Sequence, residues 1–199
     1  MSPDERTTME FGIQKAFARA VERAVRRLSQ RGGFQGDEMV RIALPPWLQR
    51  FAGVLRRTGG RPLVERFETA LNRAAERAMP EAAGTLARTV SSMGVREIRD
   101  VARGSQDAAT RYLREQTSDE LYRRLRPIVE EEVERWAVIR WYKRAAPRVL
   151  GEARGDIDDY VTRKAVEGVF AYIAVEERKL RERPFGRAGQ LLRHAICRG

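Results

Sequence analysis

The amino-acid sequence predicts an all-α fold, a single domain of about seven or eight helices joined by short loops. Three observations predict it. Apolar residues recur three and four positions apart along most of the chain, which is the pattern of one buried face on an α-helix. Glycine and proline separate these stretches at intervals that suit short helix–helix connections. Apolar residues make up 42% of the 199 residues, enough for one continuous core.

The N-terminal part of the chain contains a helix, a turn and a non-helical segment. Residues 9–28 form the first predicted helix, since their apolar residues share one face: Ile13, Phe17, Ala20, Val21, Ala24 and Leu28. Residues 31–36 are rich in glycine, which predicts a turn with positive φ angles. Residues 40–45 alternate in polarity and precede Pro46, so we expect an extended segment there. Pro46 is well placed at the first position of the next helix.

Local signals mark the later helices. Pro62 and Pro80 each begin a helix, and a short helix follows across residues 95–101. Thr117-Ser118-Asp119-Glu120 has the sequence of a capping box, which predicts that a new helix begins at Thr117. The most regular helix is expected to begin at residues 156–159, whose aspartates accept hydrogen bonds from free backbone amides.

The organisation of the chain favours one domain over residues 1–199, with its core at about residues 9–195. The sequence has no repeat of fixed period and no long linker. No stretch approaches the ~20 apolar residues of a membrane helix, so no membrane span is expected. Cys197 is the single cysteine, which excludes an internal disulfide.

The chain is strongly basic, with a net charge of +11 from 39 basic and 28 acidic residues. Residues 1–60 have a net charge of +5, and the excess is otherwise spread along the chain. Such a charge indicates either a polyanion such as nucleic acid as partner or a solvated surface of arginine–glutamate pairs. The candidate residues for polyanion binding are Arg19, Arg23, Arg26, Arg27, Arg56 and Arg57.

Residue types needed for common catalytic systems are scarce. His194 and Cys197 are the only histidine and cysteine, too few for a zinc site or for a nucleophile–histidine pair. Acidic residues gather at 130–134 and at 156–159. If these two clusters met, they could bind calcium or magnesium, but the simpler interpretation is pairing with arginine and capping of a helix. We therefore expect no enzyme, no catalytic residue, no metal and no cofactor.

Two further groups of residues allow a ligand site or a structural role. Asn72, Arg73 and Glu76 form a polar cluster on an otherwise apolar predicted helix. They could bind a ligand, although fastening of helices is the simpler interpretation. Trp136, Trp141 and Tyr142 either belong to the core or line an apolar pocket for a small molecule.

Four sequence blocks together resemble a known bacterial family. They are, in chain order, VRIALP at 40–45, LNRAAE at 71–76, DAATRY at 107–112 and DYVTRKA at 159–165. This order resembles the family of domain of unknown function 4197, from about Gly12 to Leu192. The resemblance implies a helical fold and adds no activity. Members of that family usually have an N-terminal export signal, which implies the periplasm or envelope. The polar start of this chain fits either a cytoplasmic protein or a mature form from which such a signal has been removed.

The function predicted on these grounds is a non-enzymatic binding or interaction module. A basic protein that binds nucleic acid or another polyanion is the first alternative, and a carboxylate-metal enzyme is the second. A polyanion or an apolar small molecule is the expected partner. The oligomeric state and the localisation stay open.

Overall fold

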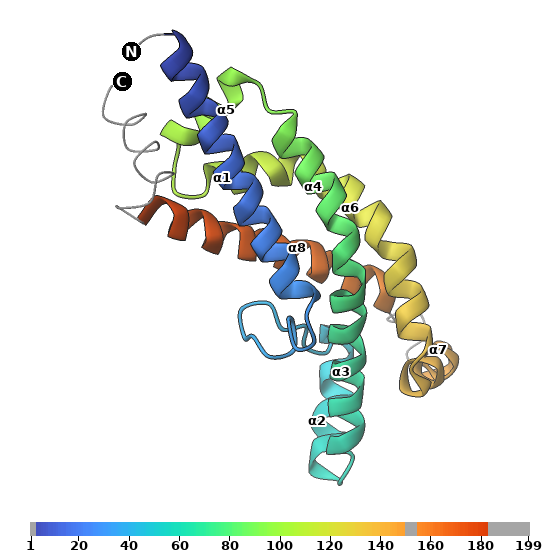
Figure 1. Cartoon of the computed structure of the whole chain (residues 1–199). Helices are drawn as coiled ribbons and strands as arrows, with labels where there is room; N and C mark the ends of the chain where they lie inside the picture. Colours follow the sequence, from blue (N-terminus) through green and yellow to red (C-terminus); the bar gives the residue numbers. More distant parts are fainter. Residues whose placement is uncertain (1–2, 150–154, 183–199) are drawn as a thin grey trace. The chain divides into compact units, whose positions relative to one another are not determined.

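The computed structural model of the chain describes residues 3–149 and 155–182. Within these ranges it contains eight α-helices, one 3₁₀-helix (η1) and no strand, so the predicted all-α class and helix number are confirmed (Figure 1). The elements are α1 (Pro3–Ser29), α2 (Pro46–Arg57), α3 (Arg61–Ala78), η1 (Met79–Glu81), α4 (Ala82–Ser91), α5 (Val95–Arg103), α6 (Ala108–Glu134), α7 (Ala137–Val149) and α8 (Ile157–Glu182).

The chain divides into two compact units. The first unit contains the described residues of Met1–Arg27, Ala82–Leu121 and Val169–Gly199, and the second contains those of Leu28–Glu81 and Tyr122–Gly168. Helices α1, α6 and α8 contribute residues to both units. That residues 1–199 form one domain stays a prediction.

In the first unit, α1 buries the face predicted from its apolar spacing, including Ile13, Phe17 and Ala24. Polar side chains join this helix to its neighbours at the edges of that face. The Gln14 side-chain amide donates a hydrogen bond to the backbone carbonyl oxygen of Val90 at 2.8 Å. Val90 lies in the last turn of α4. Burial of the apolar face is the larger stabilising contribution, because hydrogen bonds formed on folding replace bonds to water.

The start of α6 is held by a buried carboxylate from α8. Glu177 is fully buried, and its oxygens accept hydrogen bonds from the backbone N–H groups of Ala109 and Thr110 at 3.0 and 2.9 Å. The Thr110 hydroxyl donates to the same carboxylate at 2.8 Å, and Arg181 pairs with it at 2.8 Å. Glu177 thus performs from another helix the capping that a local side chain would otherwise perform.

The predicted capping box at Thr117 is wrong. Helix α6 continues through this position, and the buried Thr117 hydroxyl donates to the carbonyl oxygen of Leu113, one turn earlier, at 2.6 Å. A threonine in mid-helix can form this bond instead of a cap. Glu120 accepts instead from Thr85 at 3.0 Å and pairs with Arg88 at 3.1 Å, and both of these residues lie on α4.

The predicted cap of α8 is confirmed. One oxygen of Asp156 accepts hydrogen bonds from the backbone N–H groups of Asp158 and Asp159, at 2.8 and 3.1 Å. Burial acts to raise the pKa of Asp156, but these bonds and the contact with Arg126 outweigh it and leave the pKa below its ordinary value. The negative charge also interacts favourably with the positive end of the helix dipole.

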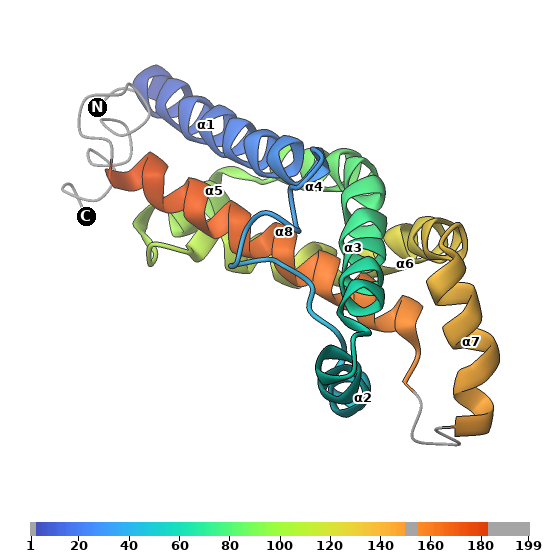
Figure 2. The same ribbon diagram turned by 90° about the horizontal axis from the view of Figure 1, so that it is seen from below.

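In the second unit, α2 and α3 follow each other in the chain and pack together (Figure 2). Helix α3 also contacts α7. Gly59 adopts a φ of +87° between α2 and α3, a conformation that glycine enters without steric cost. Pro46 lies at the first position of α2, as predicted, after an extended Pro45. Residues 41–45 have no regular secondary structure, consistent with the predicted non-helical segment. None of the helices in the described ranges is long and apolar enough to cross a membrane.

Candidate functional site

An apolar pocket of about 430 Å³ lies among α2, α3 and α7 in the second unit. Its volume is within the range of small-molecule sites, about 300–1,000 Å³. The lining residues are apolar or aromatic, and they are Leu44, Leu48, Phe51, Ala52, Val54, Leu55, Leu63, Val64, Phe67, Val138, Trp141, Tyr142 and Ala145. Each helix contributes residues three or four positions apart, so the apolar face of each one turns toward the pocket.

The pocket residues include several large apolar side chains that stay in contact with solvent. Seven large hydrophobic residues are exposed in the described part of the chain, and four of them line this pocket. Val54 and Trp141 are 61% and 64% exposed, and Phe51 and Leu63 are also exposed. A local concentration of exposed apolar surface around a concave site is typical of a binding surface.

Tyr142 fixes the inner wall of the pocket. It is buried, and its ring meets Phe67 edge to face with centroids 5.5 Å apart. Its hydroxyl oxygen accepts a hydrogen bond from the Trp47 indole N–H at 3.0 Å, and Trp47 packs in turn on Tyr160. Of the aromatic residues discussed above, Trp141 and Tyr142 therefore line a pocket, which was one of the two alternatives, and Trp136 does not.

The polar cluster on α3 holds the non-helical segment before α2. Asn72 is fully buried. Its side-chain oxygen accepts from the Ile42 N–H at 2.9 Å, and its amide donates to the Ile42 carbonyl oxygen at 2.8 Å. Glu76, also buried, accepts from the backbone N–H of Phe34 at 3.2 Å and pairs with Arg73 at 2.7 Å. Asn72 and Glu76 therefore attach the backbone of the non-helical segment to α3. The simpler interpretation of the sequence was instead a contact between two helices.

These contacts bring together three of the four sequence blocks named above. Ile42 belongs to the first block and Asn72 to the second. Tyr160 belongs to the fourth block, and its hydroxyl donates to the carbonyl oxygen of Ala43 in the first block at 3.1 Å. These three blocks thus form one structural arrangement in the second unit, which positions Leu44 at the pocket.

Comparison with known families identifies the family of the chain. The family model of DUF4197, described as a protein of unknown function, matches residues 4–196. The chain belongs to the DUF4197 family. The resemblance predicted from the four blocks is thereby confirmed. No curated protein and no solved structure matches this DUF4197 chain.

The arginines predicted for polyanion binding belong to both units. Arg23 pairs with Glu176 at 2.6 Å, and Arg26 pairs with Glu22 at 2.7 Å. The Arg27 guanidinium lies 5.9 Å from the centre of the Tyr172 ring. In all, Arg19, Arg23, Arg26 and Arg27 lie in the first unit.

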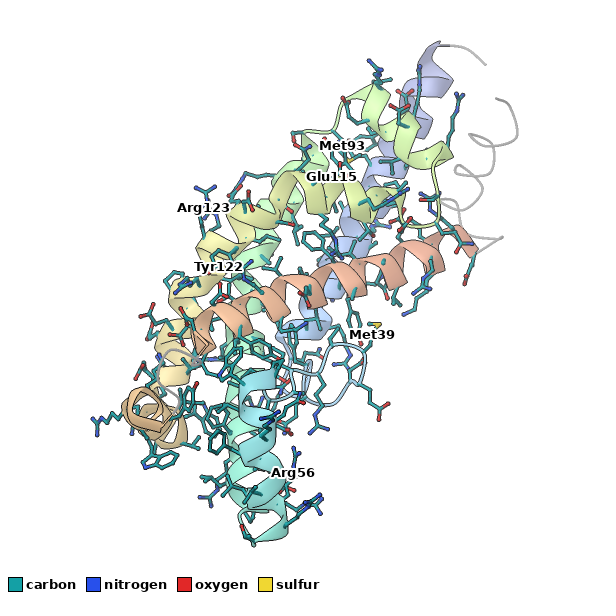
Figure 3. The ribbon with its side chains drawn as sticks, turned by 180° about the vertical axis from the view of Figure 1, so that it is seen from behind. Met39, Arg56, Met93, Glu115, Tyr122 and Arg123 are labelled. Atoms are coloured by element: carbon teal, nitrogen blue, oxygen red, sulfur yellow. The ribbon has the colours of Figure 1, made fainter. Side chains whose placement is uncertain are left out.

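Arg56 and Arg57 of the same set lie in the second unit. Arg56, labelled on α2 in Figure 3, pairs with Glu68 at 3.0 Å. Glu68 also pairs with Arg41 at 2.9 Å, so one carboxylate neutralises part of the charge on two arginines. Two aromatic residues that could stack on the bases of a nucleic acid are also engaged. Phe34 is fully buried, and Trp47 packs on Tyr160.

The two acidic clusters meet at the side chain of Lys143. Its Nζ lies 2.6 Å from a Glu134 oxygen and 2.7 Å from an Asp158 oxygen. Burial alone would lower the pKa of Lys143, but the two carboxylates outweigh it and raise the pKa above its ordinary value. Burial raises the pKa of Asp158, and Lys143 offsets only part of this effect.

An ammonium group thus already bridges the two acidic clusters. Among the residues that the structure describes, no group of three or more acidic, histidine or cysteine side chains is arranged to hold a metal ion. His194 and Cys197 lie outside the described residues.

Proposed function

We propose that this chain is a non-enzymatic binding module and that its ligand is a small apolar molecule held in the pocket among α2, α3 and α7. The observation that supports the proposal is the pocket itself, about 430 Å³ in volume and lined by apolar and aromatic residues. A buried apolar ligand would gain about 25 cal/mol for each Å² of apolar surface removed from water. The exposed Trp141 and Val54 would become covered in the complex.

The composition of the pocket also favours binding over catalysis. Tyr142 is the one lining residue with a hydroxyl group, and that hydroxyl already accepts a hydrogen bond from Trp47. General acid–base or nucleophilic catalysis requires a positioned group within hydrogen-bond reach of the substrate. Polyanion binding has less support, because Arg23, Arg26 and Arg56 are engaged by carboxylates.

A fluorescence titration with the neutral probe N-phenyl-1-naphthylamine tests the proposal. We expect a saturable rise in probe fluorescence at about one site per chain. Replacing Ala145, which lines the pocket, by phenylalanine fills part of the volume and should weaken binding at least tenfold. The matched control is Ala87→Phe, an exposed position in α4 of the first unit.

Two results would contradict the proposal. One is the absence of saturable probe binding to the wild-type chain. The other is equal affinity in the Ala145→Phe and Ala87→Phe variants, with both retaining the helical content of the wild type by circular dichroism. The second result would mean that the probe binds elsewhere on the protein.

A further inference from the structure

We propose that the ligand class of the pocket is a single-chain anionic amphiphile, with its hydrocarbon chain in the pocket and its acidic headgroup bound by arginines at the pocket edge. This inference rests on the proposed function, because it specifies the ligand for the same pocket. It follows from the distribution of charge on the helices that form the pocket.

Most of the net positive charge of the chain belongs to these helices. Residues 46–67, which include α2 and the pocket-lining part of α3, contain five arginines and one glutamate. Residues 137–149, which form α7, contain four basic residues and no acidic one. The two segments together have a net charge of +8, against +11 for the whole chain. An uncharged pocket is therefore formed by strongly basic helices.

Four of these arginines are exposed and have neither an acidic partner nor a side-chain hydrogen bond among the residues that the structure describes. We call them the arginine rim, and they are Arg50, Arg57, Arg66 and Arg144. Each lies three or four positions from an exposed apolar residue of the pocket on the same helix. These pairs are Arg50 and Arg57 with Val54, Arg66 with Leu63, and Arg144 with Trp141. Arg140 differs from the rim arginines, because it donates to the backbone carbonyl oxygen of Glu134 at 2.6 Å.

Helical geometry places residues three or four positions apart on one face of a helix. The aliphatic stem of each rim arginine can therefore lie along the apolar pocket residue beside it, with the guanidinium in water. Other arginines on the same helices have acidic partners. Arg56 pairs with Glu68, and Arg61 pairs with Glu65 at 2.9 Å. The rim is thus the part of the basic surface left available for an external anion.

The chemistry of the rim matches a carboxylate or phosphate headgroup. A guanidinium binds either group through two parallel hydrogen bonds. The headgroup would stay at the solvent boundary and avoid the desolvation penalty of a buried charge. A methylene group and a water molecule are similar in size, about 30 Å³, so the 430 Å³ pocket accommodates on the order of a dozen carbon atoms.

The experiment compares amphiphiles that share one chain and differ in headgroup charge. Dodecanoate and dodecyltrimethylammonium, each below its micelle concentration, and 1-dodecanol, below its solubility limit, are used to displace N-phenyl-1-naphthylamine from the full chain. We expect dodecanoate to displace the probe at a concentration at least tenfold lower than 1-dodecanol, and the cationic amphiphile to be weakest. The preference for dodecanoate should decrease as salt is added, because the rim is exposed.

Variants of the rim separate headgroup binding from general charge effects. The double variant Arg57→Gln and Arg144→Gln should lower the affinity for dodecanoate to that for 1-dodecanol and leave 1-dodecanol unchanged. The control is Arg103→Gln together with Arg19→Gln. It removes the same charge from two exposed arginines of the first unit, and it should retain the preference for dodecanoate.

The outcomes distinguish this inference from the proposed function. Equal displacement by dodecanoate and 1-dodecanol overturns the anionic headgroup and leaves the apolar pocket intact. Failure of the probe itself to bind overturns both proposals. Co-sedimentation with phosphatidylglycerol vesicles without dodecanoate binding would indicate a membrane surface as partner. Concentration-dependent dimerisation abolished by Trp141→Glu would indicate a second copy of the chain. Either of the last two results also overturns the inference.

Discussion

Replacing Asn72 by alanine is expected to destabilise the second unit by about 2–6 kcal/mol. Asn72 is the single asparagine of the chain, and it is fully buried. The alanine variant leaves the N–H and the carbonyl group of Ile42 without the partners they have at 2.9 and 2.8 Å. Each buried backbone group without a partner costs about 1–3 kcal/mol. Water does not reach these two groups to replace the lost hydrogen bonds, since Ile42 is 1% exposed.

Urea denaturation monitored by tryptophan fluorescence is a suitable assay. All three tryptophans, Trp47, Trp136 and Trp141, lie in the second unit. The matched control is Gln35→Ala, which removes a 2.9 Å hydrogen bond between the same non-helical segment and α3 at a position partly open to water. The control should lose less than about 1 kcal/mol. If Asn72→Ala also loses less than about 1 kcal/mol of unfolding free energy, the hydrogen bonds between Asn72 and the Ile42 backbone are not the main contribution of this residue.

Two other predictions concern the first unit. Glu177→Gln should lower the free energy of unfolding by about 2–4 kcal/mol in urea denaturation. The amide nitrogen replaces one carboxylate oxygen and cannot accept the hydrogen bond that Ala109 or Thr110 donates there, and the charge that pairs with Arg181 is lost. A change below about 1 kcal/mol would count against this role. At Glu176, burial acts to raise the pKa, but Lys179 and Arg23 outweigh it and leave the pKa below the ordinary 4.5. The folded state then binds its proton less readily than the unfolded state, so the stability contributed by Glu176 is complete above about pH 4.5 and is lost as the pH falls through the folded-state pKa. Denaturation of the wild type and Glu176→Gln between pH 3 and 6 should show a difference that shrinks toward low pH, and a constant difference would contradict the pKa shift.

The pocket shows where sequence-based prediction reached its limit. The apolar spacing in each of α2, α3 and α7 is that of a buried or half-buried face. It does not indicate which three faces turn toward one another, because each helix has the same pattern whether its face meets the core or lines a concave site. Trp141 and Tyr142 are neighbours in the sequence, yet Tyr142 is 7% exposed and Trp141 is 64% exposed.

For a related reason, the sequence alone did not show that most of the net positive charge belongs to the helices that form the pocket. Counted along the chain, the positive excess looks diffuse, because basic α7 is flanked by the acidic end of α6 and by the aspartates that begin α8. In the folded chain those carboxylates have specific partners: Glu134 and Asp158 hold Lys143, and Asp156 caps α8. The rim arginines are left without acidic partners among the described residues, which only contact information could show.

The sequence by itself determined the helical class, most helix positions and the family, because apolar periodicity and proline or glycine boundaries are local properties of the chain. It also indicated the cap at Asp156, whose partners lie two and three residues away. Only the tertiary structure decided the roles of Asn72, Glu177 and Glu120. Each of them has hydrogen-bond partners on a segment tens of residues distant. A polar side chain in a helix therefore caps another helix, holds a neighbouring segment or stays at the surface according to what folding brings beside it.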